Sequence, residues 1–175
     1  MKQRYLKKIN GFSLVEMIIY LAFFAILSIL AINATILVMK SFYSLRLDEN
    51  INQSATTAME RMSREIRNAY DVNTVSSILD TSPGMLTLLT RSYGGTNTII
   101  VFYVDASNQP HMSIDGVDNG PLVSKTITVT NLVFHLLTGP KSMAVKIEMT
   151  LHDSHSTIAK SIKFYDTIVL RGSIN

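Results

Sequence analysis

The sequence contains no cysteine and no tryptophan. Without thiols the chain has no disulfide, no thiolate zinc site, no iron–sulfur cluster and no cysteine nucleophile. Its folded part is therefore stabilised by core packing alone. The missing indole removes the best ring for cation recognition, although seven tyrosines and seven phenylalanines remain.

Charged side chains are absent from Met17 to Met39. This apolar run exceeds the roughly 20 residues that a membrane-spanning helix needs. Glu16 lies at the start of the run, and an ionisable residue at such a place is a functional hypothesis in itself. The sequence therefore predicts one membrane span with a carboxylate that needs a partner.

Glycine and proline are absent from Phe12 to Asp71. We therefore expect one continuous helix over 12–71, membrane-embedded or filament-embedded over 12–39 and amphipathic over 40–71. In the second part, apolar residues recur at spacings of three and four, which is typical of one helix face. The residues of this face are Ile51, Ala55, Ala58, Met59, Met62, Ile66 and Ala69.

The formal charge of +3 does not indicate nucleic-acid binding. Of the 16 Lys and Arg residues, four precede Gly11, so 12 remain against 13 Asp and Glu in the rest of the chain. A mature chain without residues 1–11 then has no basic excess. The early basic residues instead favour a cytoplasmic N-terminus, with everything after Met39 on the outer side of the membrane.

The segment Gly11-Phe12-Ser13-Leu14-Val15-Glu16, with the apolar run after it, resembles the type IV prepilin family, which includes the pseudopilins of type II secretion. The resemblance implies a leader peptide over residues 1–11, removed after Gly11 by prepilin peptidase, and N-methylation of Phe12. It also implies that Glu16 pairs with the N-terminal amine of a neighbouring subunit during assembly. The implied partners are prepilin peptidase, other pilin or pseudopilin subunits, an inner-membrane assembly platform and, before assembly, membrane lipid. Asn33 stands where several pilins have a helix-kinking proline.

Two simpler explanations of the N-terminus are weaker. A secretory signal has a shorter apolar region, and its cleavage site follows that region, whereas Gly11 precedes the run. A single-pass membrane anchor accounts for the length of the run but gives Glu16 no role. A DNA-uptake or adhesive pilus subunit is a further alternative, and a basic patch on the exported domain would favour it. Its candidate residues are Arg91, Lys125, Lys141, Lys146, Lys160, Lys163 and Arg171.

Residues 72–175 are predicted to form an exported β-sheet domain. Strand-like runs cover 85–90, 98–105, 111–114, 126–137, 144–152 and 157–170, and a long polar turn is expected over 115–121. The expected fold is α+β, with a long N-terminal helix packed on a mainly antiparallel sheet, as in pilins. The segments 54–69, 129–134 and 165–172 are similar to J-type minor pseudopilins and W-type minor pilins.

The sequence offers little that resembles a catalytic or metal site. It contains no nucleophile elbow, no phosphate-binding glycine loop and no zinc-protease motif, so we expect no enzyme activity, no catalytic residue and no cofactor. His152 and His155 are more readily explained as a solvated turn than as metal ligands. Asp115, Asp118 and Asn119 offer too few oxygens for calcium by themselves, although some pseudopilins bind calcium in such loops.

Overall fold

The computed structural model describes residues 11–91, 95–140, 142–153 and 160–171. The predicted leader thus lies, apart from Gly11, outside the described residues. The chain divides into two compact units, one ending at Ser44 and one beginning at Leu45. The elements are α1 (Leu14–Asn68), β1 (Asp71–Val72), β2 (Leu86–Arg91), β3 (Asn97–Val104), β4 (Pro110–Ile114), β5 (Val117–Pro121), β6 (Ile127–Thr138), β7 (Met143–Asp153) and β8 (Ser161–Val169).

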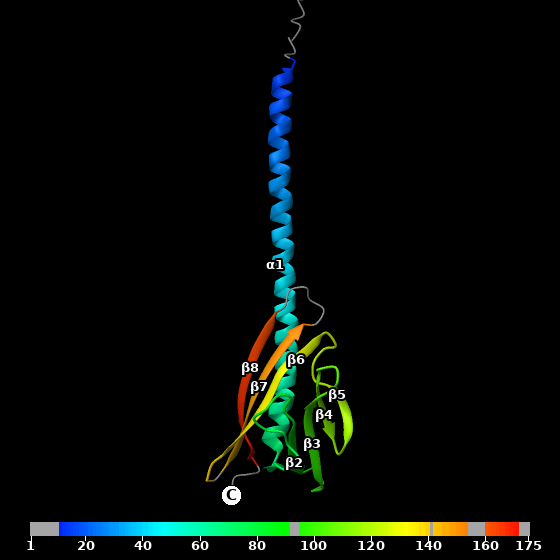
Figure 1. Ribbon diagram of the computed structural model, residues 1–175, viewed down its shortest axis with the longest axis vertical. Coiled ribbons are helices and arrows are strands. Elements are labelled where there is room, and N and C mark those ends of the chain that lie inside the picture. The colour runs from blue at the N-terminus through cyan, green and yellow to red at the C-terminus, as the bar shows by residue number, and fades with distance from the viewer. Residues whose placement is uncertain (1–10, 92–94, 141, 154–159, 172–175) are drawn as a thin grey trace, which may run out of the picture. The chain divides into compact units, whose positions relative to one another are not determined.

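The predicted long helix is confirmed as α1, with slightly different ends (Figure 1). It ends at Asn68 rather than at Asp71 because the chain there turns into β1. Tyr70 N donates to Leu89 O at 3.0 Å, and Asn73 N donates to Thr87 O at 2.9 Å. These sheet hydrogen bonds replace the bonds that one more helical turn would supply.

The predicted apolar face of α1 forms its buried stripe within the unit from Leu45 onward. Ile51, Met62 and Ile66 are fully buried, and Ala55 and Ala58 place small side chains between them. These residues belong to one hydrophobic cluster that also contains residues of the strands. The 3.6-residue helical period thus determines which face of α1 is covered.

The strands form two antiparallel sheets rather than the single sheet that we expected. One sheet has the order β1-β2-β3-β4-β5, and the other has the order β6-β7-β8. Figure 1 shows both sheets beside the C-terminal part of α1. Core residues from both, such as Phe102 of β3 and Phe134 of β6, are fully buried in the same cluster.

The prediction of a long turn over 115–121 is wrong, because only its first two residues turn. Asp115 and Gly116 have φ of 51° and 82°, and Ile114 pairs directly with Val117. Positive φ at both central residues is the geometry of a tight two-residue hairpin. The remaining residues, although polar, therefore continue as strand β5.

β6 contains a bulge that keeps its apolar side chains on the core side. Ile127 and Val129 are buried before the bulge, and Leu132 and Phe134 are buried after it. The register with β7 shifts between Val129 and Asn131, so one extra residue changes the alternation from odd to even positions.

β6 pairs with β7 along one edge. Along its other edge it accepts hydrogen bonds from the loop that precedes β2. Asp80 N donates to Phe134 O at 2.9 Å, and Gly84 N donates to Leu132 O at 2.8 Å. A Cβ at Gly84 would lie 2.9 Å from the Leu132 carbonyl oxygen, closer than real Cβ atoms approach. The loop therefore needs glycine here to reach β6.

We predict that Gly84→Ala destabilises the protein by about 1–3 kcal/mol, the usual range for overpacking. The measurement is urea denaturation of the full chain in detergent. The control is Gly139→Ala, where the nearest atom to the added Cβ is 3.4 Å away. Equal midpoints for both variants would contradict the steric explanation.

Candidate functional site

The predicted cleavage bond, between Gly11 and Phe12, lies just before the helix. Residues 11–13 have no regular secondary structure, and α1 begins at Leu14. No described atom lies within 4 Å of the position that a Cβ on Gly11 would occupy, and the Phe12 side chain is 71% exposed. As far as the described residues go, the bond is thus open on the side of Gly11 and is not part of a helical turn.

Glu16 lies in the first turn of α1, half-buried on the helix surface. An acidic side chain there suits the positive end of the helix dipole, and Ser13 with Glu16 has the spacing of a capping box. The Tyr20 hydroxyl donates to Glu16 Oε1 at 3.2 Å. The Tyr20 ring also meets the Phe12 ring edge to face, with 6.4 Å between centroids.

Gly11, Phe12 and Glu16 were predicted from the sequence, whereas Tyr20 was not. The signal for it was present in the spacing, because Phe12, Glu16 and Tyr20 are each four residues apart. Residues at that spacing lie on one helix face.

The surface of α1 that follows Glu16 is apolar and exposed. Large hydrophobic side chains from Met17 to Met39 are about half or more exposed throughout. By length and composition this is one helix that could cross a membrane, and its most apolar stretch is not buried within the protein. The core helix of a soluble protein passes the same test of composition, but it would be mostly buried.

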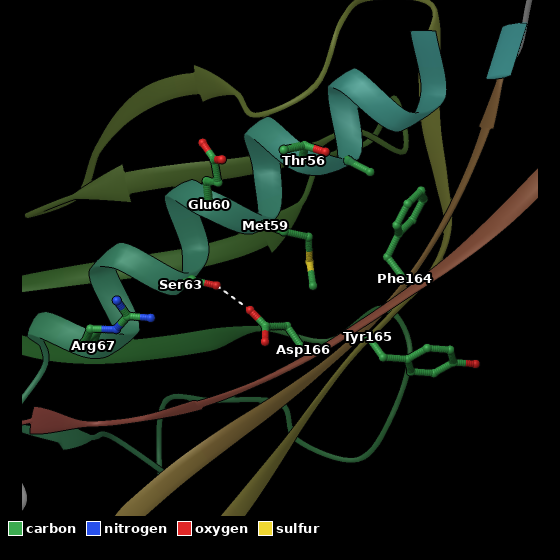
Figure 2. Close-up of a pocket in the computed structure, with 9 residues that line it drawn as sticks. Thr56, Met59, Glu60, Ser63, Arg67, Phe164, Tyr165 and Asp166 are labelled. Atoms are coloured by element: carbon green, nitrogen blue, oxygen red, sulfur yellow. Dashed lines mark hydrogen bonds between the residues drawn. The ribbon is translucent and has the colours of Figure 1, made fainter. Parts of the chain in front are cut away.

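In the second unit, a groove of about 350 Å³ lies between α1 and β8 (Figure 2). Met59 and Phe164 give it apolar walls, while Glu60 and Arg67 are charged groups on its helical side. The Ser63 hydroxyl donates to Asp166 Oδ2 at 2.7 Å and ties the two elements together. The groove is thus a surface of mixed apolar and charged character.

The loop residues that offer too few oxygens for calcium by themselves include two aspartates, and both are engaged within the protein. Asp118 accepts a hydrogen bond from Gly120 N at 2.9 Å and lies 3.0 Å from His111 Nδ1. The Gly120 N–H, followed by His111, holds the pKa of Asp118 below its ordinary value. Asp115 also has a partner within the protein, because its Oδ1 accepts a hydrogen bond from Ile99 N at 2.8 Å.

The other two histidines of the described residues, His135 and His152, also have protein partners. His135 lies between two carboxylates, with Nδ1 2.5 Å from Asp80 Oδ1 and Nε2 3.6 Å from Glu148 Oε1. His152 Nδ1 is 3.1 Å from the Lys160 carbonyl, and His155 lies outside the described residues. Within the described part of the chain, no group of three or more His, Asp or Glu side chains is placed to hold a metal ion.

Two residues of the possible basic patch, Lys146 and Lys160, are paired with acidic neighbours. Lys160 Nζ lies 2.6 Å from Asp48, and Lys146 Nζ lies 2.5 Å from Glu148. The hydrogen bond from Lys146 lowers the pKa of Glu148, which stays charged beside it. Arg91 lies over the Tyr70 ring, and Lys141 is outside the described residues. These pairs reduce the positive charge available for phosphates.

No family model, curated protein or solved structure matches the chain. The N-terminal geometry and the arrangement of α1 with two antiparallel sheets are therefore the observations from which a function is inferred.

We predict that Asp118→Asn lowers stability at neutral pH and weakens the loss of stability on acidification. The folded pKa of Asp118 is below the ordinary value of 3.8, so its contribution is present above that pH and is lost as pH falls through the folded pKa. Thermal denaturation from pH 7 to pH 3 measures the effect. The control is Glu49→Gln on the exposed surface of α1, which we expect to follow the native curve. An Asp118→Asn curve parallel to the native one at every pH would contradict the prediction.

Proposed function

We propose that the protein is a minor pilin or pseudopilin, a structural subunit of a type IV pilus or a type II secretion pseudopilus. The observation that carries the proposal is one carboxylate, Glu16, in the first turn of an exposed apolar helix, five residues after the open Gly11 position. In a single-pass anchor, a carboxylate at this position has no function. In a subunit that pairs with its neighbour, the carboxylate binds the neighbour's N-terminal amine.

The first step in this proposal is insertion of the precursor, with residues 1–11 on the cytoplasmic side. Prepilin peptidase then cuts after Gly11 and N-methylates Phe12. An accessible, non-helical bond suits proteolysis, because a protease binds its substrate in an extended conformation. Residues 11–13 have no helical structure, which supports this step.

The second step is assembly through α1. The apolar side chains from Met17 to Met39 pass from lipid to contacts with neighbouring subunits, where Glu16 meets the amine of Phe12 from another subunit. An unpaired carboxylate in a low-dielectric environment is costly, whereas a paired and hydrogen-bonded one is tolerated. The pairing thereby sets the register of adjacent helices, and the assembly platform supplies subunits from the inner membrane.

The unit from Leu45 onward is then displayed outside the cytoplasm, where its surfaces contact other subunits or external molecules. The apolar groove between α1 and β8 is one such surface. The paired lysines on β7 and before β8 do not favour the alternative of a DNA-uptake subunit. We therefore place the partners of this unit among proteins.

We predict that co-expression with a prepilin peptidase removes residues 1–11 and leaves a methylated Phe12, measured as the N-terminal mass of the purified protein. Gly11→Leu is expected to leave the precursor intact, because the peptidase site would have to accept a large side chain. Ser13→Ala, two residues further on, is the control and should be processed. An intact N-terminus in the native chain would return the protein to a single-pass membrane-anchored domain.

We predict that Glu16→Ala is processed normally but enters filaments at least tenfold less than the native subunit, since one buried ion pair is lost for each neighbour. The measurement is the amount of subunit in sheared or cross-linked filaments of a strain that carries the assembly machinery. Glu49→Ala removes an exposed carboxylate of the same helix and is the matched control. Normal filaments from Glu16→Ala would disprove the pairing.

A further inference from the structure

Glu16 already has a hydrogen-bond donor within its own helix. The Tyr20 hydroxyl lies one turn further on and donates to Glu16 Oε1 at 3.2 Å. The Phe12 ring packs against the Tyr20 ring at an interplanar angle of 77°. Glu16 thus lies beside a tyrosine whose ring is packed against Phe12.

The other hydroxyl groups of this apolar segment are used differently. Ser28 donates to the Phe24 carbonyl, and Thr35 donates to the Ala31 carbonyl, each at 2.8 Å. Both hydroxyls are therefore satisfied by the backbone of their own helix. The Tyr20 hydroxyl, in contrast, donates to a side chain, the carboxylate of Glu16.

Before assembly, a subunit in the lipid bilayer has no neighbouring subunit whose amine could pair with Glu16. Its carboxylate still needs a donor, because an ionisable side chain beside an apolar span is costly to leave unpaired. A tyrosine suits this situation because its ring is apolar and its hydroxyl is a donor. The bond is between a neutral donor and a charged acceptor, so it is weaker than the ion pair expected after assembly.

We propose that Tyr20 is a positioning residue that holds the Glu16 carboxylate in the unassembled subunit and releases it to the amine of a neighbouring subunit during assembly. The exchange replaces a neutral donor with a charged one, so it favours the assembled state. The contact between Phe12 and Tyr20 keeps the Tyr20 ring beside Glu16. The role in assembly rests on the proposed function, whereas the contact in the single subunit does not.

The test compares the full chain with its Tyr20→Phe variant, which keeps the ring and removes the hydroxyl. Both proteins are reconstituted in phosphatidylcholine nanodiscs and labelled with dicyclohexylcarbodiimide, a lipid-soluble reagent for carboxyl groups. The rate of labelling at Glu16 is followed by mass spectrometry. Tyr43→Phe is the matched control, because Tyr43 is another exposed tyrosine of α1.

We expect Glu16 to be labelled about threefold faster in Tyr20→Phe, the change that corresponds to a typical hydrogen bond between side chains in a membrane. Tyr43→Phe should label at the native rate. Equal rates in the native chain and in Tyr20→Phe would overturn the proposal, as would an equal increase in Tyr43→Phe. In either case the proposed function would still be decided by the N-terminal mass.

The yield of filaments then distinguishes the Tyr20–Glu16 contact in the single subunit from its role in assembly. Tyr20→Phe removes the donor that competes with the amine of the neighbour, so we expect it to raise the yield in the native background and to have no effect in the Glu16→Ala background. Faster labelling together with normal filaments from Glu16→Ala would retain the Tyr20 contact and reject the proposed pairing. A lower yield in the native background, or an equal change in both backgrounds, would reject the role of Tyr20 in assembly, because the effect would then not come from competition for Glu16.

Discussion

The folded unit depends on one apolar stripe of α1, which runs from Leu47 to Ile66. Both sheets contribute residues to the cluster that contains this stripe, and no disulfide supplements the packing. Burying a side chain such as Ile51 or Ile66 contributes about 1.5–3 kcal/mol relative to leaving it exposed. Ala55 and Ala58 lie between the large residues and leave room for strand side chains at the same level. The two sheets are thereby held to a common surface as well as to each other through the loop before β2.

The helix and its buried face were predictable because the signals are local. The absence of glycine and proline and the period of 3.6 residues are both contained in the segment itself. The tight hairpin at Asp115 and Gly116 was missed because its polar residues look the same in a long loop and in a strand. The division into two sheets depends on contacts between distant residues, such as Gly84 with Leu132, and the residue composition of the strands does not contain that information.

The candidate site likewise contains residues that local sequence signals predict and residues whose partners are distant in the sequence. Gly11, Phe12 and Glu16 were identified from a motif of six consecutive residues, and Tyr20 followed the same spacing but was overlooked among apolar neighbours. The partners of the histidines were beyond prediction, because His135 meets Asp80 across 55 positions of sequence. Asp118 was recognised as a polar loop residue, but its role in binding His111 required the hairpin to be known.

Two parts of the continuous helix α1 have surfaces that suit different environments. The part with the stripe is amphipathic and suits a surface that is half protein and half water, whereas residues 17–39 are apolar on every side and exposed. A helix that is hydrophobic all round is stable only in lipid or among other apolar helices. Both of those surroundings have a low dielectric constant, so Glu16 needs a donor in each of them. In the proposed filament subunit, a donor within the same helix and a donor from a neighbour are thus successive solutions to one electrostatic problem, and the stronger of the two would give assembly its direction.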